Sequence, residues 1–206
     1  MLSDQCQILT VGHSDHTIER FVKILRDNFV SAIADVRSMP YSKFTPQFNR
    51  EQLASSLKAI GVRYVFLGDL LGARRLEPEC YVDDQARYDR IAQTPRFQEG
   101  LRRLRDGSQS HRIALLCAEK DPLTCHRAIL VCRHLRPMGM EINHIVDDGS
   151  VETNQQMEQR LLNVLGLDEP ELFCSRSDTI ERAYDIQGDR IAYTRDAATA
   201  DERGTP

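Results

Sequence analysis

Short apolar runs alternate with longer amphipathic segments along the first 150 residues of the chain. Three of the five runs are continuously hydrophobic rather than alternating, which is typical of strands buried on both faces of a parallel sheet. The five runs occupy residues 6–11, 30–36, 62–67, 113–116 and 142–146. The pattern therefore predicts an α/β fold with a doubly wound, mostly parallel sheet of about five strands.

The segments between the runs have the three- and four-residue spacing of amphipathic helices. Thr17 is placed to cap the first helix, and Asn49 with Gln52 forms a capping-box pattern before the second. A further helix is expected over about residues 122–135. Residues 68–78 lack such a pattern and are expected to form a long loop.

Composition divides the chain into a core and a C-terminal part. Residues 1–149 are expected to form the α/β core domain. Residues 150–193 are expected to form a small extension packed on that core, because they contain helical patterns at 154–165 and 177–186. Residues 194–206 are polar, and we expect a disordered tail there.

The bulk composition is that of an ordinary globular protein, with 41% hydrophobic and 28% charged residues in 206. No apolar run approaches the roughly 20 residues that span a bilayer. The first residues lack the basic and apolar regions of a signal peptide. Six cysteines are scattered rather than paired in a framework, which favours free thiols in a reducing compartment. We therefore expect a cytoplasmic protein that does not contact membranes.

The formal charge of −4 is unevenly distributed. From residue 147 onward there are 14 acidic and 6 basic residues, whereas the preceding part holds 17 acidic and 21 basic residues. A mildly basic body suits a small anionic or nucleotide-like ligand. Nucleic acid is a possible partner, although the overall charge does not indicate one.

The stretch 112–127 carries most of the candidate chemistry. Its apolar run stops at Cys117, Glu119 follows in a polar turn, and Cys125-His126-Arg127 precede the next apolar run. This order predicts a buried strand, a loop and a helix start. The carboxyl ends of strands in open α/β sheets are where ligands bind, so the stretch marks a candidate site.

Polar residues and glycines also follow the other predicted strands. Because parallel strands end at one edge of the sheet, these residues are expected to share a cleft with the stretch above. We expect the substrate-binding residues to be His13, Ser14, Asp35, Arg37, Gly68, Gly72 and Arg127.

The candidate catalytic residues are Cys117, Glu119 and His126. Cys117 is a nucleophile if His126 or a guanidinium stabilises its thiolate. Alternatively, Cys117 is a small, buried, chemically inert residue at the end of a strand. Glu119 is either a general acid or base or the orienting partner of an arginine. Cys125 has the spacing of the following helix's apolar stripe, so we expect it to face the core.

No cofactor is predicted from the sequence. Zinc is an alternative, with Cys117, Cys125, His126 and His13 as ligands, although C-x7-C-H is not the spacing of common zinc sites. A second alternative is that Cys117 and Cys125 form a redox-active pair of thiols. The chain lacks G-x-G-x-x-G and G-x-x-x-x-G-K-[ST] motifs, which argues against NAD(P)-dependent and P-loop chemistry.

Five motifs follow one another along roughly residues 7–146: Thr10-Val11-Gly12-His13-Ser14, Asp35-Val36-Arg37, Pro40 with Pro46-Gln47-Phe48-Asn49, Leu67-Gly68 with Leu71-Gly72, and Leu116-Cys117-Ala118-Glu119 with Cys125-His126-Arg127. Together they resemble the uncharacterised domain of unknown function 488 family. The resemblance implies no particular activity. Where it leads us to expect two glycines, this chain has Gly72-Ala73.

These observations predict an enzyme of the hydrolase or transferase class. Its substrate is expected to be small and anionic, nucleotide-like or a nucleic-acid base, bound in a cleft at the carboxyl edge of the sheet. Two alternatives are a non-catalytic ligand-binding or regulatory module and a thiol-based redox or metal sensor.

Overall fold

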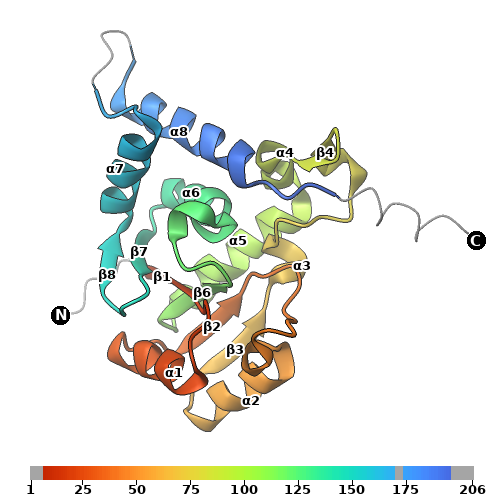
Figure 1. The fold of residues 1–206 in the computed structure, drawn as a ribbon, viewed down its shortest axis with the longest axis vertical. Helices are drawn as coiled ribbons and strands as arrows, with labels where there is room; N and C mark the ends of the chain where they lie inside the picture. The colour runs from red at the N-terminus through yellow and green to blue at the C-terminus, as the bar shows by residue number, and fades with distance from the viewer. Residues whose placement is uncertain (1–6, 170–173, 196–206) are drawn as a thin grey trace, which may run out of the picture.

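The computed structural model describes residues 7–169 and 174–195, which form a central sheet covered by helices on both faces (Figure 1). The predicted tail therefore falls, from residue 196 on, outside the described residues. Within the described ranges, no helix is both long enough and apolar enough to cross a membrane.

The main sheet has six strands in the order β3-β2-β6-β1-β7-β8. The first five are mutually parallel, and β8 pairs antiparallel to β7 at the edge. The six strands are β1 (Gln7–Gly12), β2 (Ala32–Asp35), β3 (Arg63–Phe66), β6 (Ile113–Cys117), β7 (Glu141–Ile145) and β8 (Val151–Thr153). The α/β class and the parallel sheet are confirmed. The additional strand, β8, is only three residues long, too short to produce a periodic pattern.

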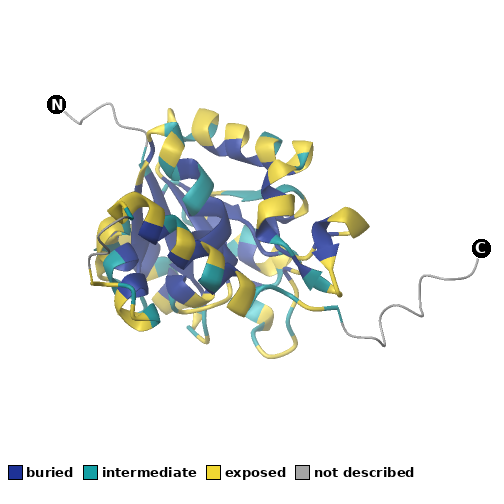
Figure 2. Cartoon of the chain, turned by 90° about the horizontal axis from the view of Figure 1, so that it is seen from above, coloured by how far each residue is buried: buried dark blue, intermediate teal, exposed yellow. Residues whose placement is uncertain are grey.

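Alternate residues of each strand face opposite helical layers, as the strand period of two requires. One layer holds α1 (Ile18–Asp27) and α2 (Arg50–Ala59), which pack on Leu9, Ile33 and Leu116. The opposite face of the strands packs on the layer that contains α5 (Pro95–Ser108), π-helical Arg127–Cys132, α7 (Asn154–Leu165) and α8 (Arg176–Ile191). Figure 2 shows the buried sheet between largely exposed outer helix surfaces. Both sheet faces are covered, which explains the continuous apolar runs.

The segment after β6 departs most from the expected regular helix over 122–135. It consists of a 3-10 turn at Pro122–Thr124, a π-helix at Arg127–Cys132, the α6 turn Arg133–Leu135 and a second 3-10 turn at Arg136–Met138. π-helical turns are rare and are often found beside functional sites. Because a π-helix and an α-helix bury similar apolar residues, the sequence pattern did not separate them.

Smaller elements occupy the segments between β3 and α5. The expected loop over residues 68–78 begins with a helical turn, α3 (Gly68–Leu71). A two-stranded hairpin and a short helix follow, which the sequence analysis did not predict. The hairpin consists of β4 (Tyr81–Val82) and β5 (Gln85–Ala86), and the helix is α4 (Tyr88–Gln93). A 3-10 turn at Pro78–Cys80 precedes the hairpin.

The helix caps agree with the sequence in one case and differ in another. The Thr17 hydroxyl accepts from the Arg20 amide at 3.2 Å, as a helix cap does. The capping box at Asn49 is absent, because the Asn49 Oδ1 atom accepts instead from the Ser42 amide at 2.7 Å. The side chain thereby stabilises the loop before α2 rather than the helix itself.

The C-terminal region packs on the core and reaches the carboxyl edge of the sheet. Tyr184 in α8 donates to Glu158 in α7 at 3.0 Å, joining the two helices. Gln187 donates to the Leu123 carbonyl oxygen at 2.7 Å, which ties α8 to the turn after β6. This contact brings Ile191 and Tyr193 to the candidate site.

Candidate functional site

Three neighbouring strands end together at one edge of the sheet. Gly12 at the end of β1 is in register with Cys117 at the end of β6, and Asp35 of β2 is in register with Leu116. The expected convergence of strand ends is therefore present, and it places Val36 beside Cys117.

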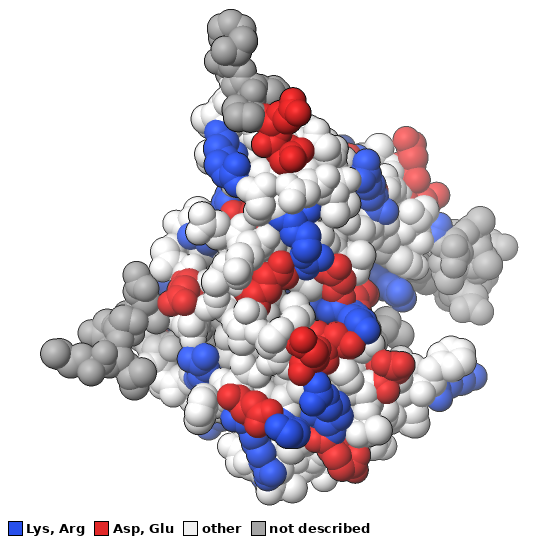
Figure 3. All heavy atoms as spheres, turned by 60° about the vertical axis from the view of Figure 1, so that its left-hand side comes forward, with Lys and Arg blue, Asp and Glu red and all other residues white. Residues whose placement is uncertain are grey.

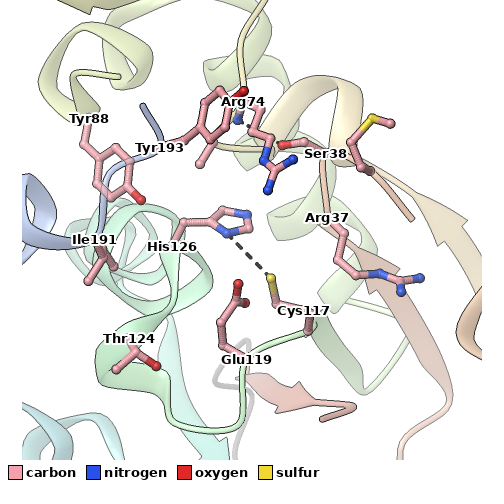
Figure 4. Close-up of a pocket in the computed structure, with 13 residues that line it drawn as sticks. Arg37, Ser38, Arg74, Tyr88, Cys117, Glu119, Thr124, His126, Ile191 and Tyr193 are labelled. Carbon is pink, nitrogen blue, oxygen red and sulfur yellow. Dashed lines mark hydrogen bonds between the residues drawn. The ribbon is translucent and has the colours of Figure 1, made fainter. Parts of the chain in front are cut away.

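A cavity of about 240 Å³ opens over this edge (Figure 4). Cys117, Glu119 and His126 line it on one side. Ala118 and Thr124 of the same segment and residues from four other segments complete the lining: Arg37, Ser38, Met39, Ala73, Arg74, Tyr88, Ile191 and Tyr193. The three residues proposed from sequence for chemistry thus lie together at one concave surface.

Cys117 and His126 are in contact at the base of the cavity. The Cys117 Sγ atom lies 3.6 Å from His126 Nδ1. On the other side of the ring, His126 Nε2 lies 3.0 Å from the Val36 carbonyl oxygen. Because a carbonyl oxygen only accepts, Nε2 carries a proton and Nδ1 is the nitrogen directed at the thiol.

Cys125 belongs to the same cluster, contrary to the expectation that it faces the core on a helical stripe. It precedes the π-helix in extended backbone geometry, so helical spacing does not apply to it. Its Sγ atom donates to Glu119 Oε2 at 3.0 Å. Ligand-type atoms of Cys117, Glu119, Cys125 and His126 all lie within 4.8 Å of one another. Two sulfurs, one imidazole nitrogen and one carboxylate oxygen are a donor set that zinc accepts.

Burial and mutual contact shift the ionisation of this cluster. Burial raises the pKa of Cys117 well above its usual value, and the neighbouring Cys125 and Glu119 raise it further. Burial also works against ionisation of Cys125, but its contact with Cys117 and the charge of Arg127 lower its pKa well below the usual value. Although burial opposes its charge, contact with Cys125 raises the pKa of His126. Within this pair, loss of a proton is therefore more favourable at Cys125 than at Cys117.

Asp35 and Arg37 form a buried ion pair behind the cavity. Arg37 Nη2 and Nε donate to the two Asp35 oxygens at 2.6 and 2.9 Å, and Tyr64 donates to Asp35 at 2.7 Å. In Figure 4 the Arg37 guanidinium is directed away from the other labelled side chains. The acceptors of Asp35 are thus occupied within the protein.

His13 lies next to this pair rather than in the cysteine cluster. Its ring stacks on Phe48 with the centroids 4.3 Å apart, and Nδ1 lies 2.8 Å from the Ser14 carbonyl oxygen. Nε2 is 3.2 Å from Arg37 Nη1. Burial, with Arg37 close by, lowers the pKa of His13 to about 4. Glu119 takes the place in the donor set that the sequence analysis gave to His13.

Arg127 is completely buried under the loop after β6. Its Nη1 atom donates to the Glu119 carbonyl oxygen at 2.6 Å, and Nη2 donates to that of Lys120 at 3.1 Å. Nε lies 3.4 Å from the Thr10 hydroxyl. Arg127 therefore supports the loop that carries Glu119 and is not among the cavity-lining residues.

Ser14, Gly68 and Gly72, which were predicted to bind substrate, are not among the residues that line this cavity. A Cβ atom on Gly68 would overlap the Arg37 carbonyl oxygen, and one on Gly72 would overlap the Ser38 hydroxyl. Ser14 has a positive φ of 48° and donates to Asp15. These residues allow close packing of the loops, and the side chain of Ala73, which replaces the second expected glycine, lines the cavity.

Sequence reasoning missed four residues that line the cavity from other segments. Arg74 and Ser38 come from the loops after β3 and β2, Tyr88 begins α4, and Tyr193 follows α8. None stands at a strand end. The Arg74 guanidinium lies over the Tyr193 ring, 4.6 Å from its centroid. No sequence signal marked this pair, because Arg74 and Tyr193 lie far apart along the chain and meet only in the folded structure.

A second, larger cavity of about 750 Å³ adjoins the first. The two share Ser38, Met39, Arg74 and Tyr193. The larger cavity also contains three further arginines, which are Arg75, Arg96 and Arg195. The cavity that contains the cysteine cluster thus continues into a second one lined by several arginines.

Comparison with known proteins identifies the family of the chain. The model of the family described as Domain of unknown function DUF488 matches residues 17–133. The match includes β2, β3, β6 and the Cys117–Arg127 segment, and it begins after the Gly12-His13-Ser14 motif. No curated protein and no solved structure matches significantly. The matched segment covers more than half of the chain, which therefore belongs to the DUF488 family.

Proposed function

We propose that the chain is an enzyme that acts on a small, anionic, nucleotide-like substrate by hydrolysis or group transfer. The observation that carries this proposal is the continuity of the two cavities. One contains the Cys117, Glu119 and His126 side chains, and the other contains arginines. A ligand that occupies both has a reacting group at the cluster and an anionic group on the arginines.

Two of the four arginines have charge available for an anion. Arg75 pairs with Glu77 at 2.9 Å, and Arg96 lies 3.8 Å from Asp69. In the described part of the chain, no carboxylate forms an ion pair with Arg74 or Arg195. Both guanidiniums lie over tyrosine rings, Arg195 at 3.4 Å from the centroid of Tyr81. These contacts hold the cations in place while leaving their charge unneutralised.

The smaller cavity suits the reacting part of such a substrate. Its volume of about 240 Å³ is below the roughly 300–1,000 Å³ of sites for drug-sized ligands, so it accommodates a single ring rather than a whole nucleotide. Tyr88 and Tyr193 line it, and their side chains surround the cavity with His126 in Figure 4. Aromatic walls favour a planar ring, because they stack on its face.

The mixed charge on one face of the molecule favours a small anion over a nucleic-acid polymer. On the face in Figure 3, basic and acidic side chains are interspersed, and no continuous basic field is visible there. A nucleic-acid binder of the usual kind presents clustered Lys and Arg along one surface. The free thiols at Cys80, Cys117, Cys125, Cys132 and Cys174 fit our expectation of a cytoplasmic location.

Binding of nucleoside monophosphates, measured by calorimetry, tests the proposal. Arg74→Ala should weaken the binding of a monophosphate by at least about tenfold, because one charged hydrogen bond contributes about 1.5–3 kcal/mol. The same substitution should leave the corresponding nucleoside less affected. Arg103→Ala is the matched control, since Arg103 is an exposed arginine of another cavity. Equal monophosphate affinity in wild type and Arg74→Ala would contradict the proposed anion site.

Turnover separates an enzyme from a non-catalytic ligand-binding module. Ligands that bind are incubated with the protein and analysed by mass spectrometry for a changed product. We expect Glu119→Gln to retain the Arg74-dependent binding and to lose product formation. Ligands that bind in this way but are always recovered unchanged would favour the module.

A further inference from the structure

We propose that Cys117, Cys125, His126 and Glu119 bind one zinc ion at the base of the smaller cavity. The metal site rests on the cluster alone. Only a role of the zinc ion in catalysis rests on the function proposed above.

The donor set selects the class of metal. Two thiols, one imidazole and one carboxylate are four ligands of the types that zinc takes. Sulfur donors disfavour magnesium and calcium, which prefer oxygen. The four residues come from the end of β6, the loop after it and the two positions just before the π-helix, so one continuous segment of chain provides the whole set.

Distances within the cluster are close to those of a tetrahedral site. Typical zinc–sulfur and zinc–nitrogen bonds place a sulfur and a nitrogen ligand about 3.6 Å apart at a tetrahedral angle. Cys117 Sγ and His126 Nδ1 are 3.6 Å apart, and Cys125 Sγ and Glu119 Oε2 are 3.0 Å apart. The remaining pairs lie within 4.8 Å. Side-chain shifts of about 1 Å therefore complete the tetrahedron.

Hydrogen bonds that join His126 and Cys125 to neighbouring backbone groups resemble those that orient the ligands of known metal sites. The His126 Nε2 proton is donated to the Val36 carbonyl, the partner type that orients metal-bound histidines, so Nδ1 is left to bind the ion. The Arg127 amide donates to Cys125 Sγ at 3.4 Å. An amide donor at sulfur stabilises the thiolate that a metal needs.

The charges of the four ligands and of Arg127 balance with a divalent ion present. Two thiolates and one carboxylate carry three negative charges, of which the ion neutralises two. The guanidinium of Arg127, which has no carboxylate within ion-pair distance among the described residues, offsets the third. This accounts for a completely buried arginine next to the loop, since a buried charge needs a compensating one.

Access to the ion runs through the cavity. Cys125 is buried and lies behind its lining, whereas Glu119 is exposed and lines it. In Figure 4 the Glu119 carboxylate is directed between Cys117 and His126. We therefore assign Glu119 the exchangeable position, at which water or substrate reaches the metal. A zinc ion open to substrate polarises a carbonyl or phosphoryl oxygen or activates water.

Metal content and cobalt spectra test the site on the full chain, prepared without a histidine tag from zinc-supplemented cells. We expect about one zinc per chain by elemental analysis. Co²⁺ added to the metal-free protein should give the strong visible absorption of tetrahedral cobalt and a thiolate-to-cobalt charge-transfer band. Cys117→Ser and Cys125→Ser should each halve that band. Cys174→Ser is the matched control and should leave it unchanged, because Cys174 lies outside the cluster.

A second pair of variants tests whether the fourth ligand is Glu119, as the structure indicates, or His13, as the sequence alone suggested. Glu119→Gln should weaken zinc binding by at least about tenfold. Loss of a residue that only orients a metal ligand already weakens metal binding by about that factor, and loss of a ligand should weaken it at least as much. His13→Gln should retain it. Each variant is first checked for a cooperative thermal transition, and the wild-type cobalt spectrum decides the question even if a variant fails to fold.

Three results would overturn the inference. One is a wild-type cobalt spectrum without a thiolate charge-transfer band, and another is full zinc retention in the Cys117→Ser/Cys125→Ser double variant. The third is a Cys117–Cys125 disulfide in the freshly isolated protein, which would make the pair a redox couple. Arg74→Ala should bind a nucleoside monophosphate more weakly while keeping zinc. Failure of the metal site is thus distinguishable from failure of the proposed function.

Discussion

His126 Nε2 lies 3.0 Å from the carbonyl oxygen of Val36, so the histidine ring is held by the backbone at the end of β2. The opposite nitrogen, Nδ1, is thereby directed at Cys117 Sγ, 3.6 Å away. One hydrogen bond to a neighbouring strand thus sets which nitrogen of the ring is available to the site.

This relationship predicts the tautomer of His126. Long-range ¹H–¹⁵N correlation spectra of the full protein should show Nε2 protonated and Nδ1 without a proton whenever the ring is neutral. His13→Gln removes the histidine beside Arg37 and provides an assignment control. A neutral His126 protonated at Nδ1 would contradict the orientation of the ring.

Gly12 is required by the close approach of β1 to the loop that carries Glu119. A Cβ atom at Gly12 would overlap the Glu119 carbonyl oxygen and lie 2.9 Å from its carbonyl carbon. Both are backbone atoms, so the loop must move. We expect Gly12→Ala to lower the free energy of unfolding by about 1–3 kcal/mol, measured by urea denaturation.

Gly107→Ala is the control for this prediction. Gly107 lies in α5, and an added Cβ atom would meet only the end of the Ile113 side chain, at 3.1 Å. Alanine is a better helix former than glycine, so its effect should be neutral or stabilising. Equal destabilisation by the two substitutions would contradict the specific role of Gly12.

Arg127 is expected to stabilise the fold through the loop after β6. Arg127→Met removes the donors to the Glu119 and Lys120 carbonyl oxygens. Leaving these acceptors unsatisfied should cost about 3 kcal/mol in the free energy of unfolding, measured in urea. Arg105→Met changes an exposed arginine and should cost little. A stability of Arg127→Met equal to that of wild type would refute this role.

His144 should make stability depend on pH. Burial lowers its pKa to about 4, below the value of 6.5 expected in the unfolded chain. Between these values the unfolded state binds a proton that the folded state does not. Stability is therefore fully present above pH 6.5 and falls as the pH decreases toward 4, by up to about 3 kcal/mol.

The measurement is the free energy of unfolding in urea at several pH values between 7 and 4.5. His144 accepts from Thr10 and donates to Asn154, so His144→Asn keeps a polar group at this position. The variant should be less stable at pH 7 and should show a shallower decrease on acidification. An unchanged slope would assign the pH dependence to other groups, such as His13.

Much of the fold could be predicted from the sequence because burial leaves a local pattern. The continuous apolar runs indicated the parallel strands, and Thr17 marked a helix start. The pattern failed where an element was too short to show periodicity, as at β8. It also failed where two helix geometries bury the same residues, as in the π-helix Arg127–Cys132. Asn49 failed as a cap because its side chain found a closer partner in Ser42.

For the candidate site, the sequence by itself determined that Cys117, Glu119 and His126 lie near strand ends, because parallel strands must end at one edge. Only the tertiary structure decided that Cys125 joins them, that His13 pairs with Phe48 and Arg37 instead, and that Arg74 and Tyr193 complete the cavity. The physical reason is that periodicity records which residues are buried along one element. Contacts between side chains from different elements depend on backbone geometry and packing, which leave no periodic trace in the sequence.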